Sequence, residues 1–190
     1  MVRLNRIYTK TGDAGETGLA DGSRIAKDHS RAQAIGDVDE ANSAIGVAAL
    51  HVGKAHVAML RRIQNELFDL GADLATPGED FAPTEMALRV VQTQIDRLER
   101  EIDAMNEALA PLRSFILPGG GAGSAELHLA RAIVRRAERS AVGAAREVGL
   151  NPLALIYLNR LSDHLFVMAR AAAADAGGEI LWTPGSTRDI

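Results

Sequence analysis

The feature of this chain that most restricts its fold is a regular apolar spacing over residues 84–109. Apolar residues recur there at alternating intervals of three and four, at Leu88, Val91, Ile95, Leu98, Ile102, Met105 and Leu109. Residues at such intervals lie along one side of an α-helix, and a second helix must cover the stripe that they form. The pattern therefore predicts a helix whose apolar side packs inside a helical bundle.

Four further stretches have a helical period, and turn residues separate them. The expected helices are 28–51, 55–75, 84–109, 124–148 and 151–177. Ser124 is the expected N-cap of the fourth helix, and Asn151 followed by Pro152 is expected to start the fifth. Only 4% of the residues are aromatic, which favours helices over sheets. Because most connections are short, the predicted fold class is all-α: an antiparallel, ferritin-like five-helix bundle.

The length of 190 residues fits one domain that buries a real core. We expect a single domain over 1–190. A glycine-rich N-terminal loop occupies 1–27, the helical bundle 28–177, and a tail 178–190. Residues 6–10, RIYTK, are expected to form a short extended piece.

Composition excludes several classes of function. The net charge of −4 argues against wholesale nucleic-acid binding, and the absence of cysteine excludes disulfides and thiolate chemistry. No run of eighteen apolar residues is present, so no membrane span is expected. The N-terminal sequence lacks an apolar signal core, and the expected compartment is the cytoplasm.

A stripe of arginines marks the fourth predicted helix. Arg131, Arg135 and Arg139 recur every four residues and so share one helix face, with Glu138 beside the last. Like charges at this spacing repel by about 0.2–0.5 kcal/mol per exposed pair. We therefore expect anionic partners for these arginines, which could be carboxylates, a phosphate chain or both. A solvated surface face is the alternative explanation.

Polar residues on two other predicted helices are candidate partners for the stripe. Asp37, Asp39 and Glu40 lie among apolar residues of the first helix. On the fifth, Asn159 and Asp163 share a face, where Asp163 can neutralise an arginine and Asn159 can bind a ligand. Each alone is more often part of a helix–helix ion pair.

Two glycine-rich segments are candidate anion sites. The segment 9–18, TKTGDAGETG, offers backbone N–H groups and a lysine, although it lacks the spacing of a P-loop. The segment 118–126, PGGGAGSAE, leads into a helix N-terminus but fails the dinucleotide fingerprint. The alternative for the first segment is an ordinary surface turn. The alternative for the second is a tight turn that lets Phe115 and Leu117 pack.

The sequence predicts no protein-held metal and no side-chain nucleophile. The Glu-x-x-His pairs of di-iron bundles are missing, so any metal is expected to be Mg²⁺ that arrives with a nucleotide. An enzyme built from these residues would act by positioning and electrostatics.

Four motifs, in this order, resemble one known family. They are YTKTGDAGETGLADG, KDHSRAQAIGDVDEANSAIG, SFILPGGGAGSAELHLARAIVRRAER and NRLSDHLFVMAR. Together they are similar to the PduO-type ATP:cob(I)alamin adenosyltransferases over nearly the whole chain. The resemblance implies a homotrimer with active sites between subunits. It also implies transfer of the 5′-deoxyadenosyl group of ATP, with Mg²⁺, to cob(I)alamin, with release of triphosphate.

The resemblance also implies site residues. The ATP loop would comprise Thr9, Lys10, Thr11, Gly12, Thr17, Gly18 and Lys27. The bundle would contribute Arg135, Arg136, Glu138, Arg139 and Asn159 to the ATP site. The catalytic residues would be Arg135 at the phosphates, Arg131 paired with Asp39 across the subunit interface, and Phe115.

The cobalamin site would include Phe115 and Asp163. Phe115 would exclude the lower axial ligand, so that four-coordinate cob(II)alamin becomes easier to reduce. Trp182 would either cover the corrin or pack on the bundle.

The expected partners are ATP, cob(II)/cob(I)alamin, a reductase and a B12-dependent acceptor enzyme. Two other functions compete with the transferase. One is a nucleotide- or corrinoid-binding module without catalysis, and the other is a structural bundle whose arginines hold subunits together.

Overall fold

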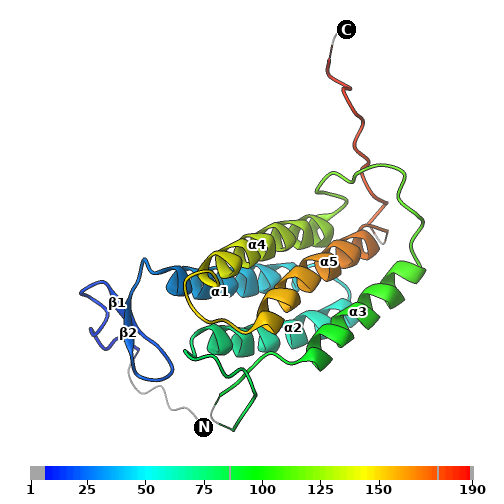
Figure 1. Cartoon of the computed structure of the whole chain (residues 1–190). Helices are drawn as coiled ribbons and strands as arrows, with labels where there is room; N and C mark the ends of the chain where they lie inside the picture. The colour runs from blue at the N-terminus through cyan, green and yellow to red at the C-terminus, as the bar shows by residue number, and fades with distance from the viewer. Residues whose placement is uncertain (1–6, 86, 175, 189–190) are drawn as a thin grey trace.

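The computed structural model describes residues 7–85, 87–174 and 176–188. The described residues form the helices α1 (Ser30–Ala48), α2 (Lys54–Leu74), α3 (Gln92–Glu107), α4 (Ala122–Ala144) and α5 (Pro152–Ala174). The strands β1 (Glu16–Gly18) and β2 (Arg24–Ala26) precede them. Figure 1 shows a helical bundle with the β1–β2 hairpin projecting from one end. The predicted all-α five-helix bundle is confirmed.

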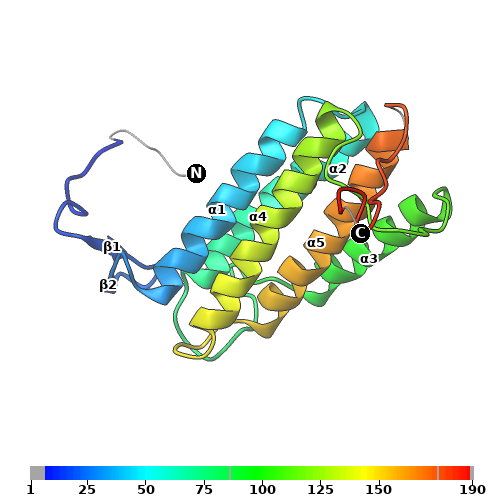
Figure 2. The same ribbon diagram turned by 90° about the horizontal axis from the view of Figure 1, so that it is seen from above.

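Helix α4 lies between α1 and α5, while α2 packs on α1 and α3 packs on α5 (Figure 2). The contact between α1 and α4 consists largely of alanines at heptad-like spacing. The fully buried ones are Ala34, Ala41, Ala48, Ala130, Ala137, Ala141 and Ala144. Small side chains allow two helix backbones to approach closely, so α4 is held firmly against α1.

A polar cluster crosses the apolar core between α2, α3 and α5. His164 is fully buried and its Nε2 lies 2.8 Å from Glu101 Oε2. Arg97 Nη1 donates to Glu101 Oε1 at 2.8 Å, and the hydroxyl of Tyr157 donates to Glu66 at 2.6 Å. Buried polar groups in a core need such partners, and these contacts fix how the three helices pack.

The predicted start of the third helix is wrong, because α3 begins at Gln92 rather than near residue 84. Asp73, buried in the last turn of α2, recruits donors from the preceding segment. Arg89 Nη1 donates to its Oδ1 at 2.7 Å, and the backbone N–H of Val90 donates to its Oδ2 at 2.8 Å. A helix through these residues would break the contacts. The buried part of the expected seam is Ile95 and Leu98, whereas Leu88 is half exposed.

The expected caps have different outcomes. Asn151 caps α5 as predicted, since its Oδ1 accepts a 3.0 Å bond from the N–H of Leu153. Ser124 is not the cap of α4, which begins at Ala122 after Gly121 in a left-handed conformation (φ 112°). A Cβ on Gly123 would lie 2.5 Å from the carbonyl oxygen of His51, so the start of α4 is pressed against the turn after α1.

The hairpin at the N-terminal end was not predicted. β1 and β2 pair antiparallel with Glu16 opposite Ala26, and Gly22 occupies the turn with φ 85°. The expected extended piece lies partly outside the described residues, and no strand is present at residues 7–10. None of the described helices is both long and apolar enough to cross a membrane.

Candidate functional site

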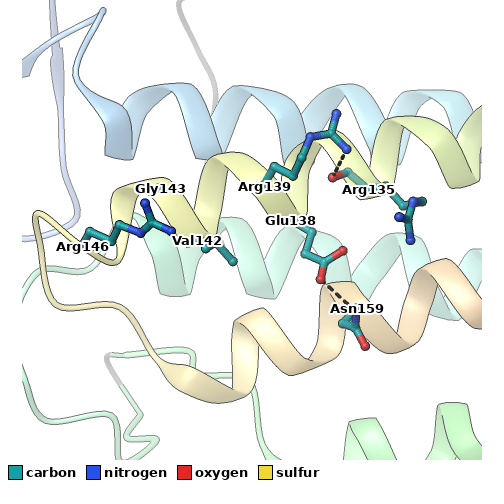
Figure 3. A pocket seen from close by; sticks show the side chains of 7 residues that line it. All are labelled: Arg135, Glu138, Arg139, Val142, Gly143, Arg146 and Asn159. Carbon is teal, nitrogen blue, oxygen red and sulfur yellow. Dashed lines mark hydrogen bonds between the residues drawn. The ribbon is translucent and has the colours of Figure 1, made fainter.

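Arginine side chains from the second half of α4 line a surface hollow of about 450 Å³ beside α5 (Figure 3). The lining residues of this arginine hollow are Arg135, Glu138, Arg139, Val142, Gly143, Arg146 and Asn159. Sequence reasoning selected four of them but missed Arg146, in the turn after α4. Arg146 follows Arg139 by seven residues, or two helical turns, and this spacing is the signal that would have identified it.

The arginine hollow carries more positive than negative charge. Arg139 Nη1 donates to the backbone oxygen of Arg135 at 2.9 Å. Within the described residues, no ion pair joins Arg135, Arg139 or Arg146 to a carboxylate. Asn159 Nδ2 donates to Glu138 Oε1 at 2.8 Å, so the one carboxylate among the described residues that line the hollow is bound to this amide. Such an arrangement suits an anion with several charges, such as a phosphate chain.

Arg131 lies one helical turn before Arg135 and is partly buried. Burial, with the charge of Arg135, lowers the pKa of its guanidinium. Its Nε is buried without a hydrogen-bond partner among the described residues. Asp39 is exposed on α1, beside an apolar groove between α1 and α2, and makes no ion pair with Arg131 in the described chain.

Arg136, expected in the ATP set, lies outside the hollow. It makes ion pairs with Glu40 and, at 3.6 Å, with Asp37 of α1. Asp37 also accepts a 2.5 Å bond from the hydroxyl of Ser140. Two of the three acidic residues predicted to pair with arginines of α4, Asp37 and Glu40, therefore do so. They pair with Arg136 and join α1 to α4, and they do not neutralise the arginine stripe.

The residues of the expected ATP loop lie in the β1–β2 hairpin and the segments that flank it. These residues are Thr9, Lys10, Thr11, Gly12, Thr17, Gly18 and Lys27. Lys10 has a positive φ of 62°, and a Cβ on Gly12 would lie 3.2 Å from Lys27 Nζ. None of the described hairpin residues lines the arginine hollow, so one chain does not unite the two predicted parts of the ATP site.

Arg24, which sequence reasoning missed, shapes this segment. Its Nη2 donates to the backbone oxygen of Thr11 at 2.6 Å, and its Nε donates to Glu16 at 3.1 Å. The guanidinium therefore holds the threonine-rich turn against the hairpin. A lone arginine at the first position of a strand carries no sequence signal for such a role.

The loop that joins α3 to α4 lies at the other end of the bundle from the hairpin (Figure 1). Phe115 is part of this loop. Phe115 is 77% exposed, so the turn does not bury its ring in the core. Its ring contacts Trp182, with 5.8 Å between the centroids. Trp182 thus packs on the Phe115 loop, an arrangement that differs from packing on the helices.

Asp163 does not neutralise an arginine of α4, contrary to expectation. It makes a 3.0 Å ion pair with Arg160 of its own helix, and Arg160 also pairs with Glu99 of α3. This side of α5 faces α3, whereas Asn159 faces α4. Among the described residues, no three His, Asp or Glu side chains form a group able to hold a metal ion.

Comparison with known proteins gives consistent matches. Residues 7–172 match the profile of the family described as cobalamin adenosyltransferase. A corrinoid adenosyltransferase from Mycobacterium tuberculosis is 53% identical over 192 residues, covering 98% of this chain and 97% of the relative. The corrinoid adenosyltransferase PduO of Salmonella typhimurium is 42% identical, covering 90% of this chain and 50% of the relative.

A solved structure shares the fold. It is a single-residue variant of a PduO-type ATP:corrinoid adenosyltransferase from Lactobacillus reuteri, complexed with cobalamin and ATP. The TM-score is 0.86 at 37% sequence identity, and the match covers 94% of this chain and 97% of that one.

Proposed function

The chain belongs to the cobalamin adenosyltransferase family, and we propose that its arginine hollow holds the triphosphate of ATP while the adenosyl group passes to a corrinoid. The reaction transfers the 5′-deoxyadenosyl group of ATP to the cobalt of cob(I)alamin and forms adenosylcobalamin and triphosphate. Residues 1–27 would act as the ATP loop of a single domain that spans 1–190.

The reaction needs no nucleophilic side chain from the protein. Cob(I)alamin supplies the electron pair of the new cobalt–carbon bond, and the C5′–O bond breaks with its pair leaving on the triphosphate. Negative charge therefore grows on the phosphate chain as the bond breaks. Preorganised cations stabilise such charge without reorganising during the reaction. Mg²⁺, bound to ATP, would share this task.

The observation that carries the proposal is a set of three guanidiniums in one hollow, those of Arg135, Arg139 and Arg146, which have no acidic partner among the described residues. A multiply charged anion relieves their mutual repulsion, and charge-assisted hydrogen bonds are the strong ones. Glu138, with Asn159, would contact the nucleoside end. Arg136 remains a predicted ATP ligand by resemblance only, and its ion pairs with α1 favour a structural role.

We propose that the complete site forms between subunits of a homotrimer. An apolar groove between α1 and α2 includes Phe68, which is 70% exposed, and Asp39 lies beside it. On α4, Leu129 is 60% exposed near Arg131, whose buried Nε has no hydrogen-bond partner in the part of the chain that the structure describes. An apolar surface of this kind suits a second copy of the chain. A neighbouring subunit would bring Asp39 to Arg131 and its ATP loop to the arginine hollow.

Phe115 would cover the lower face of the corrin, with Asp163 as a further cobalamin contact. Its exposed ring is available to a large apolar ligand. Removal of the lower axial ligand would make cob(II)alamin easier to reduce. The electron would come from a reductase, and the product would pass to a B12-dependent enzyme. We propose that the enzyme acts in the cytoplasm, where it has access to ATP.

The test mixes the purified protein with MgATP and chemically reduced cobalamin without oxygen, and follows the absorbance spectrum. We expect loss of the cob(I)alamin band and growth of a light-sensitive alkylcobalamin, only when ATP is present. Arg100→Ala, which removes an exposed arginine of α3 outside the hollow, is the control variant and should behave like the parent protein. A folded protein that binds ATP but leaves the spectrum unchanged would instead be a binding module.

A further inference from the structure

The C-terminal segment 180–182 forms a short antiparallel ladder with the Phe115 loop. The backbone N–H of Leu117 donates to the oxygen of Ile180 at 2.8 Å, and that of Trp182 donates to the oxygen of Phe115 at 2.8 Å. Ile116 lies opposite Leu181 in this pairing, and the hydroxyl of Ser114 donates to the oxygen of Trp182 at 2.7 Å. Two segments far apart in sequence therefore behave as one unit.

Arg170 of α5 joins both segments to the bundle. The residue is 5% exposed, and its Nη2 donates to the backbone oxygen of Ala110 at 2.7 Å. Its Nε donates to Glu179 Oε1 at 2.6 Å. Ala110 lies near the start of the loop between α3 and α4, and Glu179 directly precedes the ladder segment. One guanidinium therefore sets the position of both segments relative to α5. We call this pair of contacts the Arg170 clasp.

The glycines of the loop allow this close assembly. A Cβ on Gly119 would lie 3.2 Å from the side chain of Ile180. One on Gly120, whose φ is 88°, would lie 2.9 Å from the Cβ of Ala173 and 3.0 Å from the oxygen of Gly178. The glycine-rich motif therefore lets the loop lie against the end of α5 and the start of the tail.

Phe115 depends on this assembly for its position. Its ring is 77% exposed, and the ring of Trp182, tilted by 57°, is its aromatic neighbour among the described residues. An exposed side chain on a free loop would sample many rotamers, and ordering it costs conformational entropy. Catalytic groups need support of this kind, because a shift of about 1 Å can cost 10²-fold in rate.

From these contacts we propose that Trp182 and the Arg170–Glu179 ion pair are positioning residues that hold Phe115 in place against the corrin. The inference rests on the role proposed above for Phe115. It assigns to the tail a task in generating reducible cob(II)alamin and none in the transfer step itself.

The test compares two activities of the same protein preparation. One assay starts from cob(II)alamin with a reductant too weak to reduce the free corrinoid, and the other starts from chemically reduced cob(I)alamin. For Trp182→Ala and Glu179→Gln we expect cob(II)alamin-dependent turnover to fall by about tenfold or more. Turnover from cob(I)alamin should stay within about twofold, a difference in barrier below 0.5 kcal/mol. Electron paramagnetic resonance of cob(II)alamin on the ATP-loaded protein should show less of the four-coordinate form.

Controls separate this inference from the proposed function. Arg188→Ala changes a tail residue beyond the ladder and should leave both activities unchanged. Glu179→Asp retains the charge and should restore part of the lost activity. The double variant Phe115→Ala/Trp182→Ala should be no worse than Phe115→Ala alone, because residues that act through each other are not additive.

Each outcome has one meaning. If Phe115→Ala lowers cob(II)alamin-dependent turnover while Trp182→Ala and Glu179→Gln do not, the positioning role is wrong and the proposed function stands. Equal losses in both assays for Trp182→Ala would also overturn it. If Phe115→Ala itself has no effect, the role proposed for Phe115 fails first. Trp182 is partly exposed, so its variant should fold even if Glu179→Gln does not.

Discussion

Asn159 on α5 holds Glu138 on α4 through a 2.8 Å hydrogen bond, and this contact turns the carboxylate of the arginine hollow away from its arginines (Figure 3). A free glutamate at this position would neutralise part of the charge that we expect ATP to meet. The amide therefore keeps the hollow positive before any ligand arrives.

Asn159→Ala should lower the affinity for MgATP by about tenfold, the equivalent of 1.4 kcal/mol. The released Glu138 would pair with Arg135 or Arg139 and compete with the phosphates. Isothermal titration calorimetry would measure the dissociation constant. Adding Glu138→Gln should recover part of the loss, and a double variant that binds no better than Asn159→Ala would contradict the idea.

Arg135→Ala should reduce kcat/KM for ATP by about 10- to 100-fold, because hydrogen bonds to charged groups contribute about 1.5–3 kcal/mol. Steady-state kinetics with saturating cob(I)alamin would measure it. Arg100→Ala is the matched control on α3. Unchanged kinetics in Arg135→Ala would remove the main support for a triphosphate site in this hollow.

Arg131→Glu should dissociate the trimer, because it would place two carboxylates together at the proposed contact with Asp39. Sedimentation velocity would report the change in mass. The exchange variant Arg131→Glu/Asp39→Arg should regain the larger mass. If the single variant keeps the parent mass, the two residues do not meet across an interface.

Stability should fall in acid through Glu101. Burial alone would raise the pKa of this carboxyl, but hydrogen bonds from His164 and Arg97 outweigh it and hold the pKa at about 2, below the usual 4.5. A lowered pKa stabilises the folded state above pH 4.5, and this contribution is lost as the pH falls towards 2.

Urea unfolding between pH 7 and pH 2 would measure this dependence. Glu101→Gln should flatten the curve between pH 4.5 and 2 and lower stability at pH 7. Glu99→Gln, at a half-exposed position of the same helix, is the control. A parent-like slope in Glu101→Gln would assign the acid sensitivity to other carboxyls.

Trp182 is the one tryptophan in the chain, so its fluorescence reports on the tail. Corrinoid binding should quench this emission strongly, because the corrin absorbs at the emission wavelengths and would lie beside Phe115. Titration of the ATP-loaded protein, corrected with free N-acetyltryptophanamide at equal corrinoid concentration, would measure the effect. Quenching no greater than that of the free indole would place the corrin elsewhere.

The helices were predictable because their signals are local. Regular apolar spacing predicted the bundle, and the short side chain of Asn151 before Pro152 predicted a cap. The start of α3 was not predictable from local signals. The buried carboxylate of Asp73, on α2, accepts hydrogen bonds from Arg89 and Val90, and these bonds keep the two residues out of a helix. That competition involves residues distant in sequence.

The site divides in the same way. The periodicity of Arg135 and Arg139 is visible in the sequence, and so is the face that they share. The acidic residues of α1 were predicted as partners for arginines of α4, but the sequence did not show that they pair with Arg136 rather than with the stripe. The pairing of Asp163 with Arg160 of its own helix was not predicted. The contact of Trp182 with Phe115 depends on tail placement, for which no periodic pattern exists.

The tail described above adds nothing to the buried apolar core, whose residues all precede Glu179. The bundle therefore folds without an apolar contribution from the tail, whereas the proposed reduction of cob(II)alamin depends on the tail. A substitution at the partly exposed Trp182 would therefore pass a screen that scores abundance, solubility or melting temperature. Detecting its functional effect would require an assay of cob(II)alamin-dependent turnover.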